Sequence, residues 1–145
     1  MTDVSMVLDS DTLSELSRGH PRVVARARVY LERHGRLTTT AVTVFERLRG
    51  YHAALAAGRP FEPQLRQFEA FAAACVVLPL DEQAAARAAR IWGVLDRKAR
   101  RGLGDILVAA VASVHGLPLV TRNRRDFRRI AELPFVGLTL VDWTR

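Results

Sequence analysis

The chain has 145 residues, the size of one ordinary domain, so we expect a single domain over residues 1–145. Apolar residues make up 49% and charged residues 26%, which argues against disorder over most of the chain, and no apolar run approaches the ~20 residues that a membrane span needs. A formal net charge of +7, from 22 Lys and Arg against 15 Asp and Glu, favours a polyanionic partner such as nucleic acid, with solubility alone as the alternative explanation.

The chain starts with a predicted buried strand over residues 4–8, which ends at Asp9 and Asp11. This run is too short for a signal peptide, and Cys75 is the only cysteine, which excludes an intrachain disulfide and a thiolate zinc site. A reduced, cytoplasmic location is therefore expected. The other elements predicted in the first half are helices over 12–18, 22–34, 41–57 and 62–74, and strands over 37–40 and 76–78.

In the second half, Asp81 is a good N-cap residue for a long Ala-rich helix that we expect to reach about Arg100. Gly102 and Gly104 then interrupt the chain. The remaining predicted elements are a helix over 105–115, a strand over 117–121, a short basic helix and a strand over 138–141. Alternating strands and helices predict an α/β fold, a three-layer α/β/α sandwich with a mostly parallel sheet of about five strands.

Acidic and amide side chains follow the predicted strands or open the helices between them. In an open parallel sheet, ligands bind outside the carboxyl ends of the strands. Asp9 and Asp11 directly follow the first strand, and Glu46 lies within two helical turns of the end of the second. The other candidates are Asn123 and Asp126, which follow the fourth strand, and Asp105, which opens the preceding helix.

Most of these residues also have a structural interpretation. Asp11 and Asp105 could be helix N-caps, while Glu46 could pair with an arginine and Asp126 with a surface cation. Asp9 is the hardest to explain in this way, because a carboxylate at the end of a buried strand must be partnered or bound to a cation. Converging carboxylates repel one another, and a divalent cation removes the repulsion; oxygen ligands select Mg²⁺ or Mn²⁺ over zinc.

The segment Asp9-Ser10-Asp11-Thr12 resembles the D-x-D-x-T signature of haloacid-dehalogenase-type phosphatases, in which the first Asp is a phosphorylated nucleophile. Gly104-Asp105 resembles the later acidic motif of that family. That motif should follow a hydrophobic strand, whereas residues 98–102 are basic and Gly-rich. The phosphatase is the alternative interpretation.

A set of motifs in order resembles the PIN-domain ribonucleases, in particular the VapC-type toxins of bacterial toxin–antitoxin pairs. The motifs are Val7–Asp11 with the first acid, Thr43–Gly50 with Glu46, Gly104–Ala110 with Asp105, and Leu119–Asn123 followed by Asp126-Phe127. The resemblance spans nearly the whole chain. Many members of the family have Asp where Asn123 stands, so Asn123 and Asp126 both stay candidates for the last site residue.

The resemblance implies a metal-dependent endoribonuclease in which an activated water molecule attacks the RNA. Asp9 and Asp105 would bind the principal Mg²⁺ or Mn²⁺. Glu46 would be a further ligand, and either Asp126 or Asn123 would complete the set of catalytic residues.

Arginines beside the last two motifs are expected to hold the RNA backbone, because the planar guanidinium suits phosphate. These predicted RNA-binding residues are Arg101, Arg122, Arg124 and Arg125. The resemblance also implies a homodimer and a small antitoxin protein that blocks the site, with no membrane partner. The alternative from another class is an inactive PIN-like module that binds RNA without cleaving it.

Overall fold

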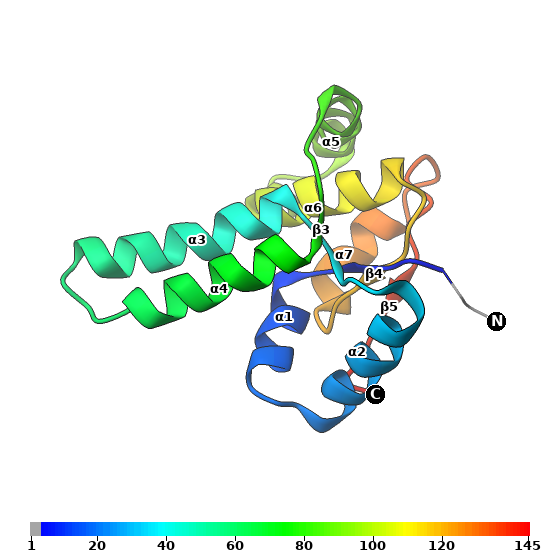
Figure 1. Cartoon of the computed structure of the whole chain (residues 1–145). Helices are drawn as coiled ribbons and strands as arrows, with labels where there is room; N and C mark the ends of the chain where they lie inside the picture. The colour runs from blue at the N-terminus through cyan, green and yellow to red at the C-terminus, as the bar shows by residue number, and fades with distance from the viewer. Residues whose placement is uncertain (1–3) are drawn as a thin grey trace.

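A five-stranded parallel sheet organises residues 4–145, which are the residues that the computed structural model describes (Figure 1). The spatial order of the strands is β3-β2-β1-β4-β5, and every neighbouring pair is parallel. The strands are β1 (Val7–Leu8), β2 (Thr38–Thr40), β3 (Val76–Leu78), β4 (Leu119–Val120) and β5 (Leu140–Val141). The direction of strand addition therefore reverses between β1 and β4, which is where ligands bind in open α/β sheets.

Helices connect the strands and cover both faces of the sheet (Figure 1). They are α1 (Ser10–Ser17), α2 (Pro21–His34), α3 (Ala41–Ala56), α4 (Glu62–Ala74), α5 (Glu82–Val94), the 3-10 helix η1 (Ala99–Arg101), α6 (Leu103–Val114) and α7 (Arg124–Ala131). Helices α3 and α4 run side by side as a hairpin that extends away from the sheet. Within residues 4–145, no helix has the length and apolar character that crossing a membrane requires.

The central strands place successive residues on opposite faces of the sheet, as strand geometry requires. Val7 and Leu119 pack in one core with residues of α5, α6 and α7. Leu8 and Val120 pack in the other core with residues of α1, α2 and α4. The predicted three-layer α/β/α sandwich with a parallel sheet is therefore confirmed.

The largest difference from the sequence prediction is the end of the long helix after Asp81. Asp81 is its N-cap as predicted and accepts a hydrogen bond from Ala84 N (2.9 Å), but the helix ends at Val94 and not near Arg100. The Asp96 side chain accepts from Ala99 N (2.8 Å) and thereby starts a new turn, which becomes η1.

Other element boundaries also differ from the predictions. Helix α1 begins at Ser10 with Asp9 as its N-cap residue, and α6 begins at Leu103. Strand β1 is shorter than residues 4–8, because Met6 N bonds the Tyr30 hydroxyl (3.0 Å) and not a neighbouring strand. The strands expected over 117–121 and 138–141 are likewise reduced to the residues of β4 and β5.

Candidate active site

The carboxyl ends of β1 and β4 form one wall of the candidate site. The Thr12 hydroxyl donates to Val120 O (3.0 Å), and the Thr39 hydroxyl donates to Leu8 O (2.9 Å). These buried bonds satisfy strand carbonyl groups at the end of the sheet. Threonine side chains from α1 and β2 therefore bind the backbone at the carboxyl ends of β4 and β1.

Asp9 follows β1 and is 7% exposed. The pKa of the Asp9 carboxyl is raised to about 7. Burial is the main cause, followed by the negative charge of Asp11, and the charge of Asp105 contributes less. The side chain that contacts it is a hydroxyl, since Thr121 Oγ1 lies 3.1 Å from Asp9 Oδ2. No cationic side chain of the described chain pairs with Asp9, so near neutral pH this carboxyl is only partly ionised unless an external cation stabilises its charge.

Asp105 lies in the first turn of α6 and shares its surroundings with other acids. Burial raises the pKa of Asp105 to about 6, and the charges of Asp126, Glu46 and Asp11 add to that increase. Gly102 is the N-cap residue of α6, so the N-cap interpretation of Asp105 is wrong. Over residues 4–145 no arginine pairs with Glu46, so that structural interpretation is not supported either.

Gly104 makes room for the Glu46 carboxylate. A Cβ atom at position 104 would lie 2.1 Å from Glu46 Oε2, far inside van der Waals contact. The observed position of the Glu46 carboxylate is therefore possible only because residue 104 has no side chain; a larger residue there would displace the end of the Glu46 side chain. The amino-terminal end of a helix favours a negative charge, which makes this a suitable place for the carboxylate.

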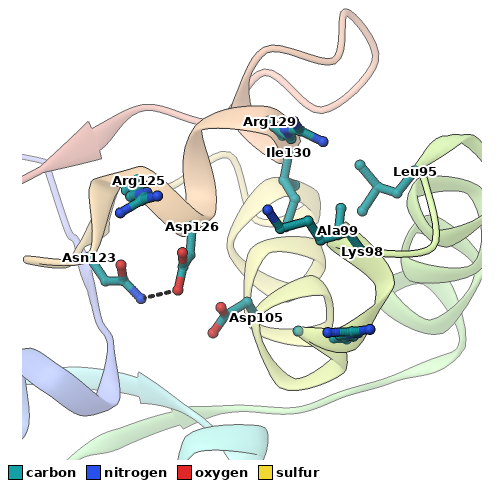
Figure 2. Close-up of a pocket in the computed structure, with 11 residues that line it drawn as sticks. Leu95, Lys98, Ala99, Asp105, Asn123, Arg125, Asp126, Arg129 and Ile130 are labelled. Atoms are coloured by element: carbon teal, nitrogen blue, oxygen red, sulfur yellow. Dashed lines mark hydrogen bonds between the residues drawn. The ribbon is translucent and has the colours of Figure 1, made fainter.

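Asp11 joins α1 to the turn between β4 and α7. Its Oδ2 accepts hydrogen bonds from Arg122 N (3.1 Å) and Asn123 N (2.9 Å). Asn123 Nδ2 in turn donates to Asp126 Oδ2 (2.7 Å), the bond drawn in Figure 2. Asp11 is therefore neither an N-cap nor a free carboxylate, and Asp126 is held by an amide and not by a surface cation.

Sequence reasoning did not single out Thr121, whose hydroxyl lies 3.1 Å from both Asp9 Oδ2 and Asp11 Oδ2. A hydroxyl donates one proton, so it bonds one of these oxygens at a time. Leu8 pairs with Val120 in the sheet, which brings the next residues of the two strands together. A parallel register between these strands would have identified Thr121 from the sequence.

The predicted RNA-binding residue Arg122 is exposed and also forms an ion pair within the chain. Its guanidinium bonds Glu15 Oε2 (2.9 Å), and Arg18 bonds the other oxygen of the same carboxylate (2.6 Å). The Glu15 side chain lies on α1 and is only 7% exposed. Its ion pair with Arg122 connects α1 to the start of the turn between β4 and α7.

A cavity of about 640 Å³ opens beside these acids, between η1 and α7 (Figure 2). Asp105, Asn123 and Asp126 lie along one side of it. Of the predicted RNA-binding residues, Arg101 and Arg125 line the cavity, whereas Arg122 and Arg124 do not.

The donor set fits a hydrated Mg²⁺ or Mn²⁺ better than a closed metal cage. Among the described residues, no three His, Cys, Asp or Glu side chains form a ready-made metal site. Mg²⁺ keeps several waters and is commonly held by one or two carboxylates together with substrate phosphates. Asp9 and Asp105, with raised pKa values and oxygen donors, meet that requirement.

Comparison with known proteins adds the following findings. Residues 6–133 match the model of the PIN domain family. The chain is 30% identical over 141 residues to the tRNA(fMet)-specific endonuclease VapC of Salmonella typhimurium strain LT2, which covers 97% of this chain and 98% of that relative. All the acidic residues named above lie within the matched residues.

Solved structures share the fold over nearly the whole chain. A chain of VapBC-1 from nontypeable Haemophilus influenzae superposes with a TM-score of 0.78 at 24% identity, covering 98% of this chain and 100% of that chain. A chain of DNA-bound VapBC from Salmonella typhimurium gives a TM-score of 0.73 at 28% identity, with 97% and 98% covered. The sheet and its helical layers are thus those of known structures.

Proposed function

Because the chain belongs to the PIN domain family and matches a VapC endonuclease along nearly its full length, we propose that it is a metal-dependent endoribonuclease and the toxin of a toxin–antitoxin pair. The observation that carries the proposal is the environment of Asp9 and Asp105. Their pKa values are raised to about 7 and about 6, and no cation of the described chain neutralises them. A divalent ion would supply the missing positive charge.

In this proposal Asp9 and Asp105 hold the principal Mg²⁺ or Mn²⁺. Glu46, with Asp126 or Asn123, completes the site partly through water. When bound, the ion would neutralise charge on the phosphate oxygens and activate the attacking water. No protein nucleophile is needed.

The chain's own residues orient this set of ligands. The Thr121 hydroxyl bonds Asp9 or Asp11, and Gly104 admits Glu46 beside α6. The Asn123 amide holds one carboxylate oxygen of Asp126 and leaves the other available toward the cavity.

The partners follow from the charge and from the relatives. Arg101, Arg122, Arg124 and Arg125 would hold the RNA backbone, and the exposed guanidinium of Arg122 also pairs with Glu15. The VapBC assemblies that the chain resembles are toxin–antitoxin systems, which supports a small antitoxin protein as a partner. We also propose a homodimer, on the family resemblance alone.

The phosphatase alternative is not favoured. In a haloacid-dehalogenase-type site the later acidic motif follows a hydrophobic strand, whereas Asp105 follows the 3-10 helix η1. Furthermore, the matched family is that of the PIN domain. The inactive RNA-binding module is separated from the nuclease by the following experiment.

The test is cleavage of RNA by the purified chain with Mn²⁺, Mg²⁺ or EDTA. We expect cleavage with either ion, none with EDTA, and a loss of at least about 100-fold in Asp9→Asn and Asp105→Asn, because each removes a ligand charge. Glu62→Gln, at an exposed position on α4, is the control and should cleave normally. Undiminished cleavage by both aspartate variants would contradict the site, and salt-dependent binding without cleavage would favour the inactive module.

A further inference from the structure

Arg47 follows Glu46 on α3 and has no part in the proposed cleavage step. The Glu46 carboxylate lies against Gly104 of α6, whereas the Arg47 guanidinium bonds α1. Asp9 is the N-cap residue of α1, so Arg47 joins the helix that begins at Asp9 to the helix that carries Glu46. We propose that Arg47 is a positioning residue, which holds α3 against α1 and thereby fixes Glu46 relative to Asp9. This inference rests on the proposed function and adds a residue on which the same site depends.

The Arg47 guanidinium contacts three helices. Its Nη1 donates to Ser14 Oγ (2.8 Å) and to Ser10 O (3.4 Å), both on α1. Its Nη2 donates to the Tyr51 hydroxyl (3.4 Å), one turn further along α3. Its Cζ lies 5.2 Å from the centre of the Phe68 ring on α4. One side chain therefore connects the first half of α1 to both helices of the α3–α4 hairpin.

The junction between α1 and the hairpin has few other directed contacts. Across residues 4–145, no other hydrogen bond or ion pair joins α1 to α3 or α4. The junction encloses a cavity of about 250 Å³, lined by Leu13 and Leu16 of α1 and by Phe68 and Phe71 of α4. The hairpin extends away from the sheet (Figure 1), so the contacts near its base determine its direction. Apolar packing around a cavity is not directional, whereas the Arg47 hydrogen bonds are.

Stability alone does not account for an arginine at position 47. Its Nε is buried without a hydrogen-bond partner among the described residues, and no acid of residues 4–145 pairs with its charge. A buried donor without an acceptor and a half-buried charge without a counter-charge both lower the stability of the fold. Methionine would fill the same apolar surroundings without either defect. What arginine adds is a planar group that bonds α1 in a fixed geometry.

Arg47 acts through position and not through charge. Burial and the neighbouring acids raise the pKa of Asp9 and of Asp105, and the charge of Arg47 is not among the causes of either shift. Removal of its charge alone is therefore not expected to weaken the site. Arg49 provides the matched comparison, because it lies on the same helix and is exposed, with its guanidinium over the Phe45 ring.

The test is isothermal titration of the full chain with Mn²⁺, together with unfolding in urea. In Arg47→Met we expect about 3- to 10-fold weaker Mn²⁺ binding, because Glu46 is no longer held in place, with an unchanged or higher midpoint of unfolding. Arg47→Lys and Ser14→Ala should be intermediate, because each keeps part of the contact with α1. The control Arg49→Met should change Mn²⁺ binding less than about 2-fold.

Cleavage kinetics separate positioning from RNA binding. In Arg47→Met we expect kcat to fall at least about 10-fold while KM changes less than about 2-fold, because a displaced ligand affects the reaction step. A rise in KM with unchanged kcat would make Arg47 an RNA contact and overturn the proposal. Mn²⁺ binding equal to that of the wild-type chain would also overturn it, as would a midpoint of unfolding that falls together with the Mn²⁺ affinity.

A last measurement does not depend on the metal. Spin labels at Arg28→Cys on α2 and at Ala57→Cys at the end of α3, in a Cys75→Ala background, report the direction of the hairpin by double electron–electron resonance in EDTA. Arg47→Met should broaden or shift the distance distribution, and Arg49→Met should not. An unchanged distribution in both variants overturns the proposal. If the wild-type chain binds no Mn²⁺, the proposed metal site fails, and these distances still decide whether Arg47 holds the hairpin.

Discussion

At the scale of single residues, the Asp9 carboxyl makes stability depend on pH. Its pKa is about 7 in the folded chain against an ordinary value of 3.8, so folding retains a proton that the unfolded chain releases. This contribution to stability is fully present below about pH 4 and is lost as the pH rises through about 7. Asp105 acts in the same direction up to its pKa of about 6.

We therefore predict that, in EDTA, the free energy of unfolding falls between pH 5 and pH 8 by more in the wild-type chain than in Asp9→Asn. The difference should be on the order of 2 kcal/mol, since each pKa unit corresponds to about 1.4 kcal/mol. Urea unfolding at both pH values measures it. Equal slopes for the two proteins would refute the prediction. Mn²⁺ should raise the melting temperature of the wild-type chain more at pH 8 than at pH 5.

Gly104 gives a second prediction at this scale. In Gly104→Ala the new Cβ would meet Glu46 Oε2, the end of a flexible side chain, so the carboxylate must move aside. We expect a loss of about 0.5–1.5 kcal/mol in the free energy of unfolding and at least about 10-fold slower cleavage. The matched background is Glu46→Ala, in which the clash is absent. There the same change should be neutral or stabilising, because alanine favours helix. A similar loss of stability in both backgrounds would show that Glu46 is not the obstacle.

At the scale of elements, the turn between β4 and α7 depends on α1. Asp11 accepts from two backbone N–H groups of that turn, at Arg122 and Asn123. In Asp11→Ala the Arg122 N–H loses its partner, whereas the Asn123 N–H keeps the Thr121 hydroxyl oxygen (3.0 Å). We therefore expect the amide hydrogen of Arg122 to exchange at least about 10-fold faster and that of Asn123 to change less, with little change in the β-sheet. Asp11→Asn keeps one acceptor oxygen and should be intermediate. Unchanged exchange at both amides would show that the turn is held by other contacts.

Element types and order could be predicted from the sequence, whereas several ends could not. The periodicity that identifies α5 continues past Val94, and only the Asp96 bond to Ala99 N ends the helix there. The carboxyl-end rule placed Asp9, Glu46 and Asp105 in one region. This agrees with the structure, in which the charge of Asp105 helps to raise the pKa of Asp9, and the charge of Glu46 helps to raise the pKa of Asp105. Their roles as ligands stay a prediction.

Contacts between side chains that are distant along the chain could not be predicted from the sequence. The pair of Arg122 with Glu15 joins residues on α1 and after β4. No local pattern distinguishes Arg122 from Arg125, which pairs with no acid of residues 4–145. The same holds for the approach of Glu46 to Gly104. Such contacts depend on how α1, α3 and α6 pack, which the order of elements does not determine.

At the scale of the whole molecule, a basic chain carries a cluster of acids at one edge of its sheet, and basic side chains line the cavity beside them. As the toxin of a pair, the chain expressed alone should arrest bacterial growth, and Asp105→Asn at equal protein level should not. Co-expression of the small reading frame next to its gene should restore growth. Counting of colonies under induction measures each case; arrest by both forms of the chain would contradict a toxic nuclease activity.

The pairing of β1 with β4 has a consequence for synthesis on the ribosome. Asp9 leaves the exit tunnel early, but its strand lacks a neighbour on one side until Leu119 and Val120 have been translated. Asp105, Thr121 and Asp126 are also translated long after Asp9. A nascent chain therefore has no assembled centre until the residues up to Asp126 have left the exit tunnel.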